Sequence, residues 1–317
     1  DVETERSVIL DEIAMREDDP GDALAEAFAH RLFAGHPVGD PVSGTTRSVK
    51  GLTRAQIHGY YRRRYDASCM VVAVAGGVSH RDVVRWVREA FGDRLGSDSL
   101  PMAPRPGPGF ALVKPSVGLL TRDTEQAQLT LGVPALRRHH PDRYSLALLS
   151  AALGGGMSSR LFQRIREEHG LAYTCFSGAS AYADTGSWSL YTACQPSNLG
   201  TVADLISREL VAVAADGITA DELELAQGQL CGATVLGLED TESRMNRIGR
   251  RALTSGRHVS LDVELSAIRR VTLDDVTSIA RRLLSRPMTA VVSGPFDRIR
   301  DLPDEVRTMA RRAQWVG

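Results

Sequence analysis

Residues 52–76 read LTRAQIHGYYRRRYDASCMVVAVAG, and residues 271–294 read VTLDDVTSIARRLLSRPMTAVVSG. Near its start each stretch has a threonine, Thr53 or Thr272, followed by a helical pattern and then a continuous apolar run. A short apolar run closed by glycine is typical of a buried strand. The two stretches therefore predict the same unit, a helix followed by a buried strand, at two places in the chain.

The two stretches are related by a nearly constant spacing. The two threonines lie 219 positions apart, and the closing glycines, Gly76 and Gly294, lie 218 positions apart. Upstream, GHPV at 35–38 lies opposite GRHV at 256–259, at a spacing of 221. Three similar spacings in the same order favour a duplication over coincidence. We therefore predict an α+β fold of two homologous domains, each with a mainly antiparallel sheet covered by helices on one side.

A linker is expected between the two copies. Residues 96–110, GSDSLPMAPRPGPGF, are rich in Pro, Gly and Ser. We predict a first domain in 1–97, a linker at 98–110 and a second domain in 111–317. About 120 residues precede the counterpart of residue 12 in the second copy, whereas 11 residues precede it in the first. We therefore expect the first domain to lack about its first hundred residues, as in a fragment, a processed piece or one half of a split enzyme.

The composition argues against several classes of protein. The formal net charge is −1, whereas nucleic-acid binding normally needs a basic face. No run of about 18 apolar residues occurs, so we expect no membrane span. The four cysteines are far apart and form no C-x-x-C pair, which favours reduced core thiols in a cytosolic protein over a zinc ribbon. Arginine far outnumbers lysine, which indicates a GC-rich bacterial genome.

Glu5 and Glu12 share one predicted helix, residues 2–17. A spacing of seven residues is about two helical turns, so both carboxylates point the same way. Acidic residues in the first turns of a helix also favour the helix dipole, which offers a purely structural interpretation. Two carboxylates cannot hold zinc without further ligands, and the eight histidines include no i, i+4 pair. The residue pattern alone therefore does not predict a metal site.

Four stretches of sequence point to a known family. They read ERSVILDEIAMREDDP, HPVGDPVSGT, YYRRRYDASCMVVAVAGGV and, at 153–177, LGGGMSSRLFQRIREEHGLAYTCFS. The set closely resembles the pitrilysin (M16) zinc peptidases and the related mitochondrial processing peptidases, and the last stretch is similar to their second-domain signature. The resemblance runs over essentially the whole chain. It implies a zinc-bearing first domain and a metal-free second domain.

The resemblance also implies roles for four residues. Two histidines of an H-x-x-E-H motif would bind zinc and its glutamate would activate water, but the motif is absent from this chain. Glu12 matches the third zinc ligand, and Glu5 matches a glutamate that supports the site without binding the metal. Arg166 and Tyr173 match a pair that binds substrate and stabilises the transition state. The implied cofactor is Zn²⁺, one per complete enzyme.

Two glycine-containing motifs are interpreted as structural. LGGGMSSRLF at 153–162 matches neither the phosphate-binding loop nor the dinucleotide-binding fingerprint. We predict for it a tight turn between two helices or a flexible loop. HPVGDPVSG at 36–44 predicts a turn-rich loop, and His36 is not expected to bind metal.

The resemblance implies a zinc-dependent endopeptidase that cleaves peptides or unfolded segments in an enclosed chamber. We expect this chain alone neither to hold stoichiometric zinc nor to cleave peptides. The expected partners are the peptide substrate, a complementary chain or segment carrying H-x-x-E-H, and a second copy in a dimer, in the bacterial cytoplasm. Two alternatives stay open: a non-catalytic M16-like partner or core structural subunit, and a peptide-binding module without hydrolysis.

Overall fold

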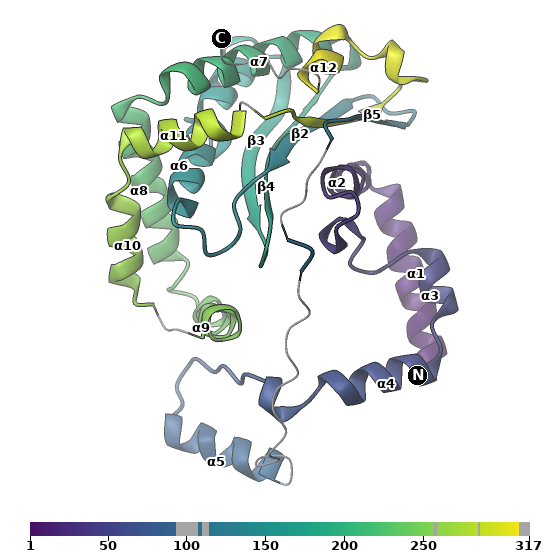
Figure 1. The fold of residues 1–317 in the computed structure, drawn as a ribbon, viewed down its shortest axis with the longest axis vertical. Helices are drawn as coiled ribbons and strands as arrows, with labels where there is room; N and C mark the ends of the chain where they lie inside the picture. The colour runs from purple at the N-terminus through teal and green to yellow at the C-terminus, as the bar shows by residue number, and fades with distance from the viewer. Residues whose placement is uncertain (93–106, 110–113, 257–258, 285, 311–317) are drawn as a thin grey trace.

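The computed structural model describes residues 1–92, 107–109, 114–256, 259–284 and 286–310. Its centre is a five-stranded mixed sheet built by the second half of the chain (Figure 1). The strands are β1 (Val117–Thr121), β2 (Ala127–Pro134), β3 (Ala172–Ala181), β4 (Gly186–Cys194) and β5 (Thr289–Gly294). Their order is β1-β5-β2-β4-β3, with β1 parallel to β5 and the other pairings antiparallel. The predicted α+β class and the mainly antiparallel sheet are confirmed.

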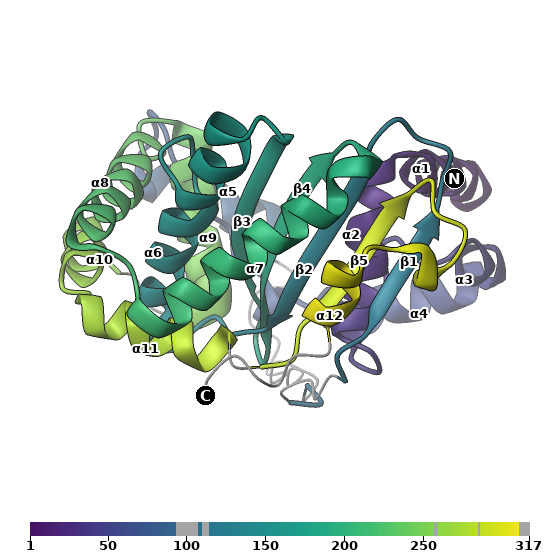
Figure 2. The ribbon, with the colours of Figure 1, turned by 90° about the horizontal axis from the view of Figure 1, so that it is seen from above.

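One face of the sheet is covered by a layer of helices (Figure 2). Apart from α9 (Thr241–Ser255), the α-helices of this half are α6 (Arg143–Gly154), α7 (Leu199–Asp216), α8 (Ala220–Leu236), α10 (Leu261–Arg269), α11 (Leu273–Leu284) and α12 (Asp304–Met309). α6 packs on β3, while α11 packs on both α6 and α7. Between the layers lies a large core in which Trp188, Leu129 and Leu148 are fully buried.

Helix α2 (Pro20–Leu32) packs on the opposite face of the sheet, against β5 and β2. The prediction that helices cover one side only is therefore wrong. Phe28 and Leu32 of α2 join Val291 of β5 in a separate buried cluster. Gly132 of β2 makes room for the helix, because a Cβ there would lie 2.7 Å from Phe28 Cζ.

The remaining helices of the first copy extend away from the sheet (Figure 1). They are α1 (Val2–Asp18), α3 (Thr46–Gly51), α4 (Arg54–Arg64) and α5 (His80–Phe91). α1 packs against α2 and α3. The Arg6 guanidinium of α1 donates to the carbonyl of Leu52 at 2.8 Å and to the carbonyl of Val49, which ties α1 to the end of α3.

The apolar run at 69–76 does not form the buried strand that its sequence predicts. Residues 70–75 adopt no strand, and Val72 and Val74 are 55% and 44% exposed. A strand requires hydrogen-bonded neighbours, and no described strand lies beside this run. Its counterpart β5 lies between β1 and β2 and is buried along its whole length. The described residues thus contain one sheet, and the predicted second sheet domain is not shown.

The helices nevertheless follow the internal repeat. α2 and α9 (Thr241–Ser255) each begin after a capping aspartate, Asp19 and Asp240, which lie 221 positions apart. α2 packs on β5 of the second copy, and α9 lies beside the apolar run of the first. There a Cβ on Gly249 would lie 3.1 Å from Ala73 Cβ. Each copy of the repeat therefore contributes one helix that packs beside the apolar run of the other copy. Most of the linker predicted at 98–110 lies outside the described residues.

Two predictions from composition can be compared with the structure. Within the described part of the chain, no helix has the length and hydropathy to cross a bilayer. All four cysteines are free thiols, and Cys175, Cys194 and Cys231 are buried as predicted. Cys69 is exposed, so its predicted core position is wrong. The reason is that Cys69 begins the apolar run that has no sheet to join.

We expect one thiol to react rapidly with Ellman's reagent in the native protein. Burial raises the pKa of the Cys175 thiol to about 12 and that of Cys194 to about 11, so little reactive thiolate forms near neutral pH. Cys69 is the exposed thiol, and Cys69→Ser should remove the fast phase. Titration before and after denaturation measures both populations. More than one fast thiol in the native protein would contradict these positions.

We expect Gly154→Ala to lower the free energy of unfolding by about 1–3 kcal/mol, the usual range for overpacking. The end of α6 lies so close to β3 that a Cβ on Gly154 would overlap the backbone nitrogen of Ser177. Gly228→Ala in α8 is the matched control, because nothing lies within 4 Å of its Cβ position. In a helix Ala is favoured over Gly by about 0.5–1 kcal/mol, so the control should gain stability. Equal denaturation midpoints for the two variants would disprove the close approach.

Candidate functional site

Arg166 and Tyr173 meet where η4 (Phe162–Glu168) leads into β3. The guanidinium carbon of Arg166 lies 4.6 Å from the centroid of the Tyr173 ring and 4.7 Å from that of Phe162. Its Nη1 also donates to the Tyr173 carbonyl at 3.3 Å. The chain reverses between them at Gly170, whose φ of 61° favours glycine. The structure therefore brings the two predicted substrate-binding residues into direct contact and adds Phe162, which the sequence did not single out.

The Tyr173 side chain is presented to solvent. It is 74% exposed, and its hydroxyl has no hydrogen-bond partner among the described residues. η4 is a π-helix, and such wide turns are frequent at functional sites. β3 lies at one edge of the sheet, so its outer backbone groups face no described strand. The Arg166–Tyr173 pair is thus placed beside an open strand edge.

The Gly-rich turn before η4 is held in place by α8. Gln229 donates to the Gly155 carbonyl at 2.8 Å, and the Arg160 guanidinium donates to the Glu222 carboxylate at 2.7 Å. Burial acts to raise the pKa of Glu222, but the hydrogen bond and charge of Arg160, together with hydrogen bonds from Thr219, outweigh it and lower the pKa. The predicted tight turn between two helices is confirmed. Its anchoring fixes the start of η4 and hence the position of Arg166.

Glu5 and Glu12 lie on α1, as predicted, and both side chains are exposed. Neither carboxylate has a hydrogen bond or ion pair with a described residue. Glu3 on the same helix is paired, since Arg6 Nε lies 3.0 Å from its carboxylate. The helix dipole can account for Glu5 in the first turn but not for Glu12, two turns further on. α1 thus carries two unpaired carboxylates with the same orientation.

These carboxylates do not make a zinc site with the other described residues. A catalytic zinc ion needs about three protein ligands, with His, Cys, Asp or Glu as donors. The described residues contain no group of three such side chains in a suitable arrangement. Glu12 is available as one oxygen ligand, and the described chain supplies no partner ligands for it. No zinc-dependent step can therefore be assigned to these residues alone.

His36 has a structural role in the loop after α2. Its ring is buried, and Nδ1 accepts a hydrogen bond from Val38 N–H at 3.1 Å. Its Nε2 lies 3.3 Å from Asp184 Oδ2. These contacts join the loop after α2 to the turn between β3 and β4.

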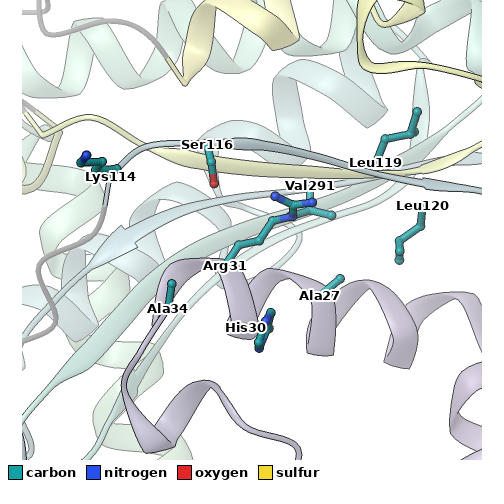
Figure 3. Close-up of a pocket in the computed structure, with 9 residues that line it drawn as sticks. All are labelled: Ala27, His30, Arg31, Ala34, Lys114, Ser116, Leu119, Leu120 and Val291. Carbon is teal, nitrogen blue, oxygen red and sulfur yellow. The ribbon is translucent and has the colours of Figure 1, made fainter.

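A cationic pocket between α2 and β1 was missed by sequence reasoning (Figure 3). Its volume is about 690 Å³, and His30, Arg31 and Lys114 contribute to its lining. No acidic side chain is among the lining residues. The α2 residues and Lys114 are far apart in the sequence, so no local motif could have indicated the pocket.

Comparison with known proteins agrees with this fold. The family described as the peptidase M16 inactive domain matches residues 51–230. An uncharacterized zinc protease of Mycobacterium tuberculosis is 48% identical over 309 residues, which cover 98% of this chain and 70% of that protein. The crystal structure of a peptidase M16 inactive domain from Pseudomonas fluorescens matches with a TM-score of 0.78 at 21% identity, over 93% of this chain and 70% of that chain.

A protease from Helicobacter pylori also has a similar structure. The TM-score is 0.81 at 19% identity, over 93% of this chain and 71% of that chain. At such low identity, the two solved structures show the fold alone. The family match spans more than half of the sequence, and the Mycobacterium tuberculosis relative is similar along nearly all of it. The chain therefore belongs to the M16 peptidase family.

Proposed function

We propose that this chain is part of a zinc-dependent endopeptidase that acts on peptides or unfolded segments held in an enclosed chamber. The contact between Arg166 and Tyr173 carries the proposal, and similarity to a protein named a zinc protease supports it. Glu12 would be the third zinc ligand, and Glu5 would support the site without binding the metal. The two histidines would come from a complementary chain or segment.

Arg166 and Tyr173 offer a peptide two kinds of hydrogen-bond donor. The Arg166 guanidinium is a planar fork, and donors not used on the Tyr173 carbonyl or on the Glu167 carboxylate can reach a peptide carbonyl. The Tyr173 hydroxyl is free among the described residues and can donate toward an oxyanion as it develops. Stacking between them restricts both side chains before substrate binds, which reduces the entropy lost on binding. An extended peptide can add beside the open edge of β3.

The same proposal assigns a partner to the apolar run at 70–75. Its valines are exposed, whereas β5 at the equivalent place in the repeat is buried between two strands. Strands supplied from outside the described residues would pair with this run and cover its side chains. Residues 1–97 would then belong to the zinc-bearing domain and 111–317 to the metal-free domain. A dimer would enclose the substrate.

We expect Glu12→Gln to weaken zinc binding by about tenfold or more, because the amide loses the ligand charge. The variant is made in the whole natural protein that contains this chain, and zinc content is measured after dialysis against a graded chelator. Glu17→Gln is the matched control, because Glu17 is also exposed on α1 but lies on another side of the helix. Unchanged zinc affinity in Glu12→Gln would refute the ligand assignment.

We expect Tyr173→Phe to lower kcat for peptide hydrolysis by about 10²–10³, the usual cost of removing one oxyanion donor. The phenylalanine ring preserves the stack with Arg166, so the fold and zinc content should not change. Arg166→Lys keeps the charge but loses the planar fork, and should mainly raise KM.

Tyr60→Phe is the control for the tyrosine substitution, because Tyr60 is exposed on α4, away from β3. Full activity of Tyr173→Phe would rule out donation by its hydroxyl. A whole protein that binds no zinc and cleaves no peptide would instead support the non-catalytic alternative.

A further inference from the structure

The outer edge of β1 has no described strand partner, although the short helix η6 (Ile299–Asp301) contacts β1. β1 is the first strand in the sheet order, and no described strand pairs with its outer side. Ala290 N–H donates to the Ser116 carbonyl at 3.0 Å, and Arg122 N–H donates to the Gly294 carbonyl at 2.9 Å. Because backbone groups alternate along a parallel strand, the even-numbered residues face β5. The N–H and C=O groups of Val117 and Leu119 therefore point to the open edge.

The two sides of β1 differ in chemical character. Val117 and Leu119 pack partly against the main apolar core, under the helix layer. Ser116 and Leu120 line the cationic pocket on the side of α2, and Leu119 also contributes to the lining (Figure 3). A strand added at the open edge would alternate in the same way, with apolar side chains toward the core side and the others toward the pocket.

Arg31 lies across the α2-facing side of β1. A Cβ on Gly118 would overlap the Nε of Arg31, so the absence of a side chain at Gly118 makes room for the guanidinium. Figure 3 shows Arg31 reaching from α2 toward the sheet, with Ser116 and Lys114 near the start of β1. No described residue forms a hydrogen bond or ion pair with the side chain of Arg31 or Lys114. An arginine placed against a strand with its five donors unused fits a carboxylate.

We propose that the open edge of β1 binds an extended acidic polypeptide segment as an additional strand. Its backbone pairs with Val117 and Leu119, and an Asp or Glu side chain on the pocket side forms an ion pair with Arg31 and Lys114. The open edge selects an extended peptide over a free anion, and the unpaired cations select acidic over neutral side chains. β1 and β3 are opposite edges of the sheet, so this site is separate from Arg166 and Tyr173.

The test uses a fluorescein-labelled ten-residue peptide in which valine alternates with glutamate, added to the 317-residue chain. Fluorescence anisotropy gives the affinity, and a peptide with glutamine in place of glutamate is the matched probe. We expect the glutamate peptide to bind at least tenfold more tightly, with affinity that falls as salt rises. Arg31→Gln should make the affinities for the glutamate and glutamine peptides equal, without weakening binding of the glutamine peptide. Arg208→Gln, an exposed arginine on α7, should leave it intact.

Backbone pairing is tested without changing the protein. A glutamate peptide N-methylated at alternate residues loses one set of donors, and we expect binding to fall at least tenfold. Equal affinity for the methylated peptide, or for the glutamate and glutamine peptides, would overturn the proposal. Displacement of the glutamate peptide by inorganic phosphate, with an inhibition constant similar to the Kd of the peptide, would also overturn the proposal and would indicate a small-anion site. Peptide binding is measured without zinc and without turnover. The proposed strand-addition site can therefore be refuted independently of the proposed zinc peptidase function, which the Glu12→Gln variant tests.

Discussion

The packing of α2 on the sheet connects the two halves of the described chain. Leu24, Phe28 and Leu32 bury one face of α2 against Val291 of β5. Burial of such side chains contributes about 1.5–3 kcal/mol each, an upper estimate because an unfolded chain already hides part of its apolar surface. α1 packs on α2, so the position of α1 depends on this contact. The orientation of Glu5 and Glu12 relative to the sheet therefore follows from an apolar cluster that contains neither of them.

The two proposed peptide-binding sites, beside β3 and beside β1, lie at opposite edges of the sheet. Central strands use all their backbone groups on neighbours, whereas β1 and β3 each leave one side open. At β3 the open edge adjoins the stacked Arg166 and Tyr173, which offer donors to a peptide. At β1 it adjoins Arg31, held over Gly118 with no acidic partner among the described residues. An edge strand with nearby cations provides both backbone pairing and charge, which is the combination that recognition of an extended peptide requires.

The exchange of helices explains why the two copies of the repeat look different. β5 has neighbours on both sides and α2 against one face, so its valines are buried. The run at 70–75 has α9 beside it but no described strand, so its valines remain exposed. Nearly the same sequence pattern therefore has two outcomes, because burial of a strand depends on its neighbours more than on its own residues.

Much of the local structure was predictable from sequence. The helix carrying Glu5 and Glu12 forms as predicted, and so do the helix and buried strand within 271–294, because short-range periodicity acts within a few residues. The family motifs also identified Glu5, Glu12, Arg166 and Tyr173 as candidates. The exposure of 69–76, the crossing of α2 to the far face and the pocket around Arg31 were not predictable.

The sequence by itself determined the helices, most of the strands, the internal repeat and the residue types available for catalysis. The tertiary structure alone decided which apolar run entered a sheet and which helix covered it. It also decided that Arg166 stacks on Tyr173 and Phe162, and that Arg31 and Lys114 line one pocket. The physical reason is that propensity and capping act between near neighbours, whereas burial and side-chain pairing depend on residues that only folding brings together.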